Sequence, residues 1–355
     1  MFDRLLEAPP YSLRQGEKER LLLAGLNELT RFHYEKCPDY ARILDAAWGG
    51  LGSYGAIEDV PFLPVGLFKE RELSSTDGPH IVLQSSGTSG QVPSRIVVDP
   101  ETSTRQSRAL IATFRPILGD RRLPFLAIDT RDVLKPTNLT ARGAGVLGMM
   151  KFGAKATFAL SPTLETDRKT VRDFVAAQGG APFLMFGFTF LVWTKLYEEF
   201  RDGELDLSNA ILVHSGGWKK MEERKVPNAE FREALRVRFN LTRIYNFYGF
   251  VEQIGSMFVE GPDGLLYPPN FTDVIVRKAG SWEPANLGEE GALQAVSLLP
   301  GSYPGHSVLT EDTGRILAVD NGAENRFGKA IAVTGRVEKA ELRGCSDVVA
   351  TTRAA

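Results

Sequence analysis

Residues 81–99 constrain the fold of this chain more than any other stretch of its sequence. Two β-branched runs, 81–83 and 96–98, flank a loop of small, hydroxyl-bearing residues, which predicts a strand, a tight loop and a second strand. Glycine permits positive φ and close approach of backbone N–H groups to a ligand, and hydroxyls add donors. We interpret the loop as a polyphosphate cradle, with a plain hairpin turn as the alternative. The predicted binding residues are Ser85, Ser86, Gly87, Thr88, Ser89 and Gly90, with Arg95 as the nearby positive charge.

The loop departs from two common phosphate-binding patterns. No Lys follows Gly90, as a Walker A motif requires, and the Gly-x-Gly-x-x-Gly of the dinucleotide fingerprint is missing. The loop resembles instead that of the adenylate-forming enzymes, whose pattern is Ser-Gly-Thr-Thr-Gly-x-Pro-Lys. Residues 86–90 match, Pro93 comes one residue late, and Arg95 stands where Lys is usual. The resemblance implies that the loop binds ATP and that Arg95 takes part in catalysis.

Composition excludes several classes of function. A formal net charge of −2 provides no field that would attract nucleic acid or a membrane surface. No apolar run is long enough to span a bilayer, and residues 1–4 lack the apolar core of a signal peptide. Two cysteines, Cys37 and Cys345, cannot form a disulfide framework or a metal site of their own. We therefore expect a cytoplasmic location, no nucleic-acid partner and no membrane span.

Helical and strand-like segments alternate along most of the chain. Apolar residues at helical spacing predict a helix from residue 17, interrupted at Cys37-Pro38 before a second helix at 39–48. This alternation, followed by a β-rich end, predicts an α/β protein with mixed sheets and helices plus a β-rich subdomain. The other expected segments are an extended stretch at 61–75, helices at 101–117, 169–179, about 189–201 and 221–238, strands at 124–129, 182–188, 210–214 and 244–247, and short strands from 255 to about 335.

A second motif, residues 245–252, combines an aromatic strand with a carboxylate. Glu252 comes three residues after Gly249, at the carboxyl end of the predicted strand, where ligands bind in open α/β sheets. The segment resembles the Tyr-Gly-x-Thr/Ser-Glu motif of the adenylate-forming enzymes, with Val251 in place of the hydroxyl residue. The resemblance implies that Tyr248 and Gly249 lie near adenine and that Glu252 binds Mg²⁺. The alternative is a core strand followed by a surface glutamate.

Two further segments are candidates for contacts with the nucleotide. Gly216 and Gly217 follow a β-run, and their backbone would let a flat ligand such as adenine approach, although a simple glycine turn explains them equally well. Asp312 lies in a segment that resembles the Thr-Gly-Asp element that binds both ribose hydroxyls. Glu311 is an equal candidate if Asp312 is only a turn residue.

The C-terminal segment departs from the usual adenylate-forming pattern. Gly335-Arg336 resembles the hinge before the lid of these enzymes, which implies a catalytic role for Arg336. Only 19 residues (355 − 336) follow Arg336, whereas the lid is much longer and carries a catalytic lysine; Lys339 is a guess for its replacement. We therefore expect an adenylation domain at 1–335, like the N-terminal domain of an adenylate-forming enzyme but lacking the full lid, and a short tail at 336–355.

This short form resembles one branch, the acyl-protein synthetase (LuxE-type) family of bacterial fatty-acid reductase complexes. In that family a cysteine near the C-terminus carries the acyl group as a thioester, which implies this role for Cys345. Arg343 would favour the nucleophilic thiolate, although Cys345 is alternatively an incidental tail thiol. The matching segments are 61–65 with Phe68-Lys69, the phosphate loop, 216–219, 248–249, 309–314 and 341–345.

Aromatic residues offer a wall for an apolar acid. The alternation of Phe186, Phe188 and Phe190 would place three rings on one face of a strand, although an ordinary core is the more common explanation. His306 is expected near the site, and Cys37 is expected to be buried packing.

Together these features predict an enzyme that uses ATP and Mg²⁺ to activate a carboxylic acid, fatty or aryl, as its acyl-adenylate. The acyl group would pass to Cys345 and then to a partner such as a reductase. Two alternatives stay open: a ligase that transfers to CoA or an acyl-carrier protein with a separate lid, and a non-catalytic nucleotide-binding subunit of a reductase complex.

Overall fold

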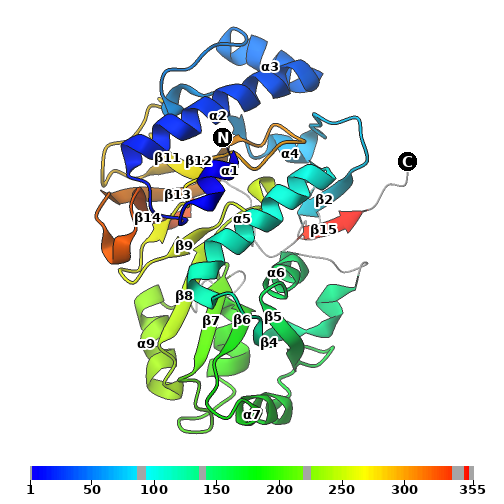
Figure 1. The fold of residues 1–355 in the computed structure, drawn as a ribbon, viewed down its shortest axis with the longest axis vertical. Helices are drawn as coiled ribbons and strands as arrows, with labels where there is room; N and C mark the ends of the chain where they lie inside the picture. Colours follow the sequence, from blue (N-terminus) through cyan, green and yellow to red (C-terminus); the bar gives the residue numbers. More distant parts are fainter. Residues whose placement is uncertain (1, 86–92, 136–140, 219–224, 338–347, 352–355) are drawn as a thin grey trace. The chain divides into compact units, whose positions relative to one another are not determined.

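The computed structural model describes residues 2–85, 93–135, 141–218, 225–337 and 348–351 (Figure 1). The chain forms two compact units. Unit 1 comprises Met1–Thr113, Gly249–Glu341 and Ala350–Ala355, and unit 2 comprises Phe114–Tyr248 and Leu342–Val349.

Unit 1 begins with three helices, α1 (Phe2–Glu7), α2 (Gln15–Lys36) and α3 (Pro38–Trp48). Pro38 occupies the first turn of α3, where its missing N–H removes no helical hydrogen bond, so the expected break at Cys37-Pro38 is confirmed. Helices α2 and α3 lie side by side (Figure 1). Cys37 is 2% exposed, which confirms it as a packing residue.

The two strands predicted on either side of the hydroxyl-rich segment are confirmed. β2 (Ile81–Ser85) and β3 (Arg95–Val98) pair antiparallel, from Ile81 opposite Val98 to Gln84 opposite Arg95. With β15 (Val348–Thr351) they form a small sheet in the order β15-β2-β3. Helix α5 (Pro100–Leu118) follows β3 and agrees with the expected helix at 101–117.

The β-rich part of unit 1 is an antiparallel array in the order β11-β12-β13-β14-β10-β9. A short strand, β1 (Leu63–Pro64), adds to β13 in parallel, and helix α4 (Leu67–Glu70) follows it. The array consists of β9 (Phe258–Glu260), β10 (Leu266–Tyr267), β11 (Thr272–Arg277), β12 (Gly291–Ser297), β13 (Ser307–Val319) and β14 (Lys329–Arg336), with short 3-10 helices at Ile57–Asp59, Val251–Gln253 and Ala323–Asn325.

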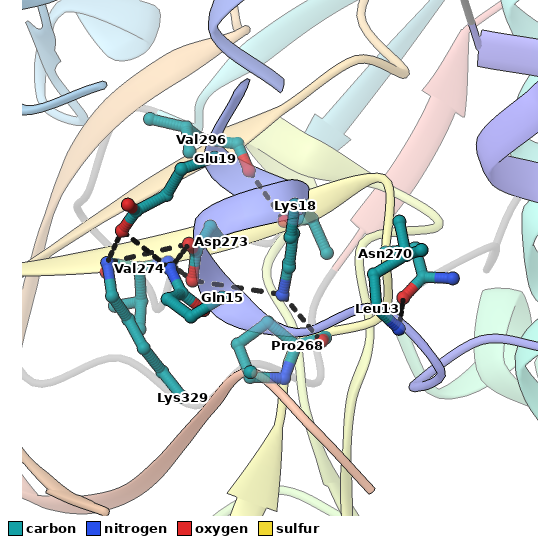
Figure 2. A network of polar contacts seen from close by, with 12 residues as sticks. Leu13, Gln15, Lys18, Glu19, Pro268, Asn270, Asp273, Val274, Val296 and Lys329 are labelled. Atoms are coloured by element: carbon teal, nitrogen blue, oxygen red, sulfur yellow. Dashed lines mark hydrogen bonds and ion pairs between the residues drawn. The ribbon is translucent and has the colours of Figure 1, made fainter. Parts of the chain in front are cut away.

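A buried polar network ties α2 to this array (Figure 2). Lys18 of α2 is 1% exposed; its Nζ donates to the Pro268 carbonyl at 2.9 Å and lies 3.8 Å from Asp273 Oδ1 on β11. Lys329 of β14 lies 3.5 Å from the other oxygen of the same carboxylate. Gln15 Nε2 donates to that oxygen at 2.6 Å, so one buried aspartate holds two lysines and an amide.

Unit 2 is a parallel sheet in the order β8-β7-β6-β4-β5. Because all five strands run in one direction, their carboxyl ends lie along one edge. Every residue of β6 is buried, as expected for a strand covered on both faces. The elements are β4 (Leu123–Thr130), β5 (Gly153–Leu160), β6 (Phe183–Phe188), β7 (Ala210–Ser215), β8 (Arg243–Tyr248), α6 (Ala141–Met149), α7 (Arg168–Ala177), α8 (Thr189–Val192), α9 (Asn228–Phe239), a 3-10 turn at Arg131–Leu134 and a π-helical turn at Trp193–Tyr197.

The structure corrects four local expectations. The stretch 61–75 is not wholly extended, because α4 interrupts it. The helix expected at 221–238 begins at Asn228, directly after Pro227, and residues 219–224 lie outside the described part. The helix expected to 201 changes to π geometry at Trp193 and ends at Tyr197. Phe190 belongs to α8, so only Phe186 and Phe188 share a strand face, with ring centroids 5.9 Å apart.

No helix among the described residues is both long and apolar enough to cross a membrane.

Candidate functional site

Glu252 lies in a short, firmly held turn of unit 1. It is 3% exposed, so the alternative of a surface glutamate is wrong. Tyr303 donates its hydroxyl hydrogen to the Glu252 carbonyl at 2.9 Å. The next side chain, Gln253, donates to the carbonyls of Ala295 and Gly305 at 2.9 and 2.8 Å. These bonds fix the backbone of the turn to β12 and to the segment before β13.

The Glu252 carboxyl is held in an environment that disfavours its charge. Burial raises its pKa above the ordinary value, and the negative charges of Glu311 and Asp312 raise it further, while the hydroxyl of Ser94 acts in the opposite sense. Its Oε1 atom is buried and accepts no hydrogen bond from any residue that the structure describes. A cation at this oxygen would therefore relieve both desolvation and repulsion.

Two carboxylates and two cations form a cluster beside it, within unit 1. Asp312 on β13 lies opposite Arg336 on β14. Arg336 NH2 donates to Glu311 Oε2 at 2.7 Å, and Arg336 Nε lies 3.6 Å from Asp312 Oδ1. Glu311 Oε1 is also 4.0 Å from Lys69 Nζ. Asp312 and Arg336, both predicted from the sequence, are thus neighbours, and Glu311 lies between two cations.

Lys69 reaches this cluster because of the β1 pairing. Leu63 and Pro64 lie opposite Val308 and Leu309, and the Val65 N–H donates to the Leu309 carbonyl at 2.9 Å. Helix α4 then turns Lys69 toward Glu311. Lys69 was expected only within a segment matched by family resemblance and had no predicted role, because a two-residue strand pairing across 245 residues (308 − 63) has no local signal.

The predicted glycine pair lies at the carboxyl end of β7, in unit 2. Gly216 has φ +84°, and a Cβ there would lie 2.9 Å from Phe188 Cδ1, so glycine is required by conformation and space. A Cβ on Gly217 would meet nothing within 4 Å. Ser215 donates its hydroxyl hydrogen to the Phe247 carbonyl at 2.8 Å, which ties this turn to β8 just before Tyr248.

His214, one residue before Ser215, is a buried structural group. Its Nδ1 lies 3.0 Å from the Thr189 hydroxyl, which also lies 3.2 Å from the Ser215 carbonyl. Burial lowers the His214 pKa to about 3, so the imidazole is neutral at physiological pH. It therefore helps to hold the turn that carries Gly216.

The predicted site residues fall into three groups. Unit 1 brings together Glu252, Asp312 and Arg336, with Gly249 at its boundary, and unit 2 contains Gly216, Gly217 and Tyr248. Arg95 opens β3 and Ser85 closes β2. Ser86, Gly87, Thr88, Ser89, Gly90, Lys339, Arg343 and Cys345 lie outside the described residues.

His306 forms part of a buried packing group rather than a group beside the acids. Its ring stacks on that of His33 with centroids 5.0 Å apart, and its Nε2 lies 3.0 Å from the Thr30 hydroxyl. Burial lowers the pKa of His306 well below the ordinary value, so it is neutral.

Within the described part of the chain, no three His, Cys, Asp or Glu side chains are arranged to hold a metal ion by themselves. Mg²⁺ needs no such cage when it is bound to a nucleotide, since it keeps waters and uses one or two carboxylates plus phosphate oxygens. The buried, unpartnered oxygen of Glu252 fits that requirement.

Comparison with known proteins gives the family and the fold. The family model described as "Acyl-protein synthetase, LuxE" matches residues 1–353. The chain is 22% identical over 363 residues to the long-chain-fatty-acid–luciferin-component ligase of Vibrio harveyi, covering 97% of this chain and 91% of that protein.

Two solved structures of 2-hydroxyisobutyryl-CoA ligase are also similar. The open conformation with 2-HIB-AMP and CoA has a TM-score of 0.68 at 14% identity, covering 94% of this chain and 79% of that chain. The postadenylation state with 2-HIB-AMP has a TM-score of 0.68 at 16% identity, covering 94% and 71%. At such low identity these similarities establish the fold, and they confirm the expected adenylate-forming α/β architecture.

Proposed function

The chain belongs to the LuxE acyl-protein synthetase family and is an ATP-dependent acyl ligase, and from this premise we propose that it activates a long-chain fatty acid as its acyl-adenylate and transfers the acyl group to a thiol. The observation that carries the proposal is the buried carboxylate of Glu252, whose Oε1 accepts no hydrogen bond from any described residue. Glu252 belongs to the segment that resembles the Mg²⁺-binding motif of the adenylate-forming enzymes. The choice of a fatty acid is supported by the name of the Vibrio harveyi relative.

In the first step a carboxylate oxygen of the acid attacks the α-phosphorus of ATP, and the bond to pyrophosphate breaks. The hydroxyls and N–H groups of Ser85, Ser86, Gly87, Thr88, Ser89 and Gly90, with Arg95, would stabilise the charge that develops on the departing pyrophosphate. Mg²⁺ held by Glu252 would neutralise phosphate charge. This chemistry is mostly positioning and electrostatics, so it needs no covalent bond to the protein.

The contacts with the nucleoside are proposed from the motifs that resemble those of the adenylate-forming enzymes. Asp312 can accept two hydrogen bonds from the vicinal ribose hydroxyls. Arg336, held by Glu311 at 2.7 Å, would keep the cluster around Asp312 in place. The backbone of Gly216 and Gly217, and the Tyr248-Gly249 segment, would contact adenine.

In the second step a thiolate attacks the acyl carbon, the bond to the phosphoryl oxygen breaks and AMP leaves with the electron pair. We propose Cys345 as this thiol, and a reductase-like partner as the later acceptor. The enzyme would act in the cytoplasm.

The test of acid activation is exchange of labelled pyrophosphate into ATP across saturated acids of 8 to 16 carbons. We expect exchange that depends on both acid and Mg²⁺, and a loss of at least about 100-fold in Glu252→Gln. Glu290→Gln is the matched control, because Glu290 is exposed and its ion pair among the described residues is with Arg315. Wild-type protein without acid-dependent exchange would refute the proposed activation.

The two cysteines provide a matched test of transfer. Labelled fatty acid and ATP should give a hydroxylamine-labile acyl-protein in the wild type and in Cys37→Ala, but not in Cys345→Ser. Retention of the label in Cys345→Ser would refute the role of Cys345. Transfer to CoA that continues unchanged in Cys345→Ser would favour the acyl-CoA ligase alternative.

A further inference from the structure

A buried carboxylate and an arginine meet at the carboxyl ends of the parallel strands of unit 2. Asp129 is the second-last residue of β4 and is 1% exposed. Its Oδ1 accepts a hydrogen bond from the Thr130 N–H at 2.7 Å. Its Oδ2 lies 3.2 Å from Nε of Arg142, which belongs to the first turn of α6. Neither Asp129 nor Arg142 belongs to a motif from which the function was predicted.

The pair lies at the same edge of the sheet as the predicted adenine contacts, Gly216 and Gly217. The parallel pairing of β4 with β6 ends with Ala127 opposite Phe186, and Asp129 and Phe188 each come two residues after this pair. Phe188 lies opposite Ser215 on β7, and its ring lies against Gly216. Since neighbouring strands are about 4.8 Å apart and β6 lies between β4 and β7, the axes of β4 and β7 are about 10 Å apart. This edge is where open α/β sheets bind ligands.

Helix α6 lies directly on aromatic rings at this edge. A Cβ on Gly145 would lie 2.8 Å from Phe186 Cζ and 3.7 Å from Phe188 Cε2. Arg142 comes one helical turn before that contact. A cation is therefore placed next to an apolar surface, and these are the two features needed to hold a carboxylic acid with a hydrocarbon chain.

A purely structural role explains this arrangement poorly. A positive side chain in the first turn of a helix opposes the helix dipole, which favours anions there. Arg142 is also incompletely satisfied: its Nε is buried, and its guanidinium makes no hydrogen bond to any residue in the described ranges. The Arg142 side chain remains 20% exposed. Asp129 thus holds the guanidinium from one side and leaves its terminal donors for another oxyanion.

We propose that Arg142 binds the carboxylate of the acid substrate, and that Asp129 is the positioning residue that orients it. The proposal rests on the proposed function, since it assigns the acid end of the same reaction. Arg142 remains protonated throughout and forms no covalent bond. Its role is to hold one carboxylate oxygen while the other attacks ATP.

The test compares Arg142→Met, Arg142→Lys and Asp129→Asn in pyrophosphate exchange with dodecanoate as the acid. Loss of a charge-assisted, two-pronged contact should raise the KM for dodecanoate about 10- to 100-fold in Arg142→Met, with the KM for ATP changed less than about twofold. Lysine should recover only part of the loss, because it lacks the planar fork. Asp129→Asn should raise the same KM by a smaller factor.

Arg131→Met is the matched control, because Arg131 is an exposed arginine in the turn after β4 and contacts only the Phe158 ring at 5.8 Å among the interactions described. It should leave both KM values unchanged. A lower Tm in Arg142→Met with both KM values unchanged would overturn the proposal in favour of a structural ion pair. A rise confined to the KM for ATP would overturn it in favour of a phosphate contact.

A direct binding measurement separates this proposal from the activity on which it rests. Equilibrium dialysis of labelled dodecanoate without ATP should show at least tenfold weaker binding to Arg142→Met than to the wild type, and equal binding to Arg131→Met. If the wild type shows no exchange, the proposed function fails, and dialysis still decides the role of Arg142. Equal binding of dodecanoate to wild type and Arg142→Met would overturn it.

Discussion

Replacing Asp273 by Asn should destabilise the protein far more than replacing the lysine beside it. Asp273 is fully buried and interacts with Lys18 at 3.8 Å, Lys329 at 3.5 Å and Gln15 at 2.6 Å (Figure 2). The Asp273→Asn change removes the carboxylate that forms the ion pair with Lys18, whereas Lys329 retains Glu19 at 3.6 Å. Removing one partner of a buried ion pair typically costs about 3–5 kcal/mol.

The magnitude can be worked from Lys18 itself. Burial lowers its pKa from 10.5 to about 8 even with Asp273 present to raise it, so at pH 7 the folded variant can lose this proton for at most about 1.4 kcal/mol, one pH unit. Deprotonation of Lys18 therefore limits its contribution to the loss of stability. Asparagine keeps one acceptor oxygen, so the variant loses only one of the two hydrogen bonds that Asp273 accepts from Gln15 and from the Val274 N–H, at about 1 kcal/mol. The weakened pairing of Lys329 adds a similar amount. The expected total is about 3–4 kcal/mol.

The pH dependence of stability gives an independent check. The folded pKa of Lys18 is below its unfolded value, so between pH 8 and 10.5 the unfolded chain binds more protons than the folded protein. Wild-type stability should therefore rise with pH across this window, by up to about 3 kcal/mol from this group, and the rise should disappear in Lys18→Met. In Asp273→Asn, Lys18 should already be neutral at lower pH, so its rise should begin below pH 8.

The assay is urea unfolding followed by far-UV circular dichroism at pH 7, 8, 9 and 10, with the m-value monitored in each variant. Lys18→Met is the matched control. It leaves Asp273 with Lys329 and Gln15, so its unfolding free energy at pH 7 should stay within about 1 kcal/mol of the wild type. The reasoning fails if Asp273→Asn loses less than about 1 kcal/mol, or if both variants lose the same amount.

Three other changes have definite expected outcomes. Glu252→Gln should raise the Tm of the ligand-free protein while it abolishes exchange activity. Burial raises the pKa of Glu252, so its ionisation in the fold is unfavourable. An unchanged or lower Tm would contradict this prediction. Gly216→Ala should lose at least about 1–2 kcal/mol in thermal unfolding, whereas Gly217→Ala should keep its stability but raise the KM for ATP; equal Tm values would oppose the assignment. The pKa of His33 is lowered to about 3 in the fold, so below pH 6.5 the unfolded chain binds a proton that the folded protein does not. The free energy of unfolding should therefore fall by up to about 1.4 kcal/mol per pH unit as the pH is lowered. In urea titrations, His33→Gln should reduce this dependence on pH.

Local signals predicted much of the fold correctly. The break between α2 and α3 follows from Cys37-Pro38, and the β2–β3 hairpin follows from β-branched runs on either side of small residues. Four of the five strands of unit 2 were expected, at 124–129, 182–188, 210–214 and 244–247, whereas β5 was not. In each case the physical cause lies within about ten residues of the element.

Other features depend on contacts between distant segments, and so had no sequence signal. The burial of Glu252 depends on Tyr303 and on the carbonyls that hold Gln253. The choice between Glu311 and Asp312 was open because both are acids in one strand. The structure distinguishes them: Glu311 lies between Lys69 and Arg336, while Asp312 is farther from Arg336. The ribose role of Asp312 stays a prediction, as do the roles of 86–90 and Cys345, which lie outside the described residues.

The charges of the unit 1 cluster suggest why its acids are arranged in this way. Glu252, Glu311 and Asp312 carry three negative charges, and Lys69 and Arg336 carry two positive ones, so the five groups sum to −1 when all are ionised. Glu311 and Asp312 face the two cations, so the unbalanced negative charge lies on Glu252. Burial makes a charge at this position the most unfavourable of the three. A cluster selected only for stability would have replaced that group by an apolar one of similar size. A buried carboxylate that keeps one oxygen bare is instead suited to a cation that arrives with its own counter-charge, as Mg²⁺ does when it is bound to ATP.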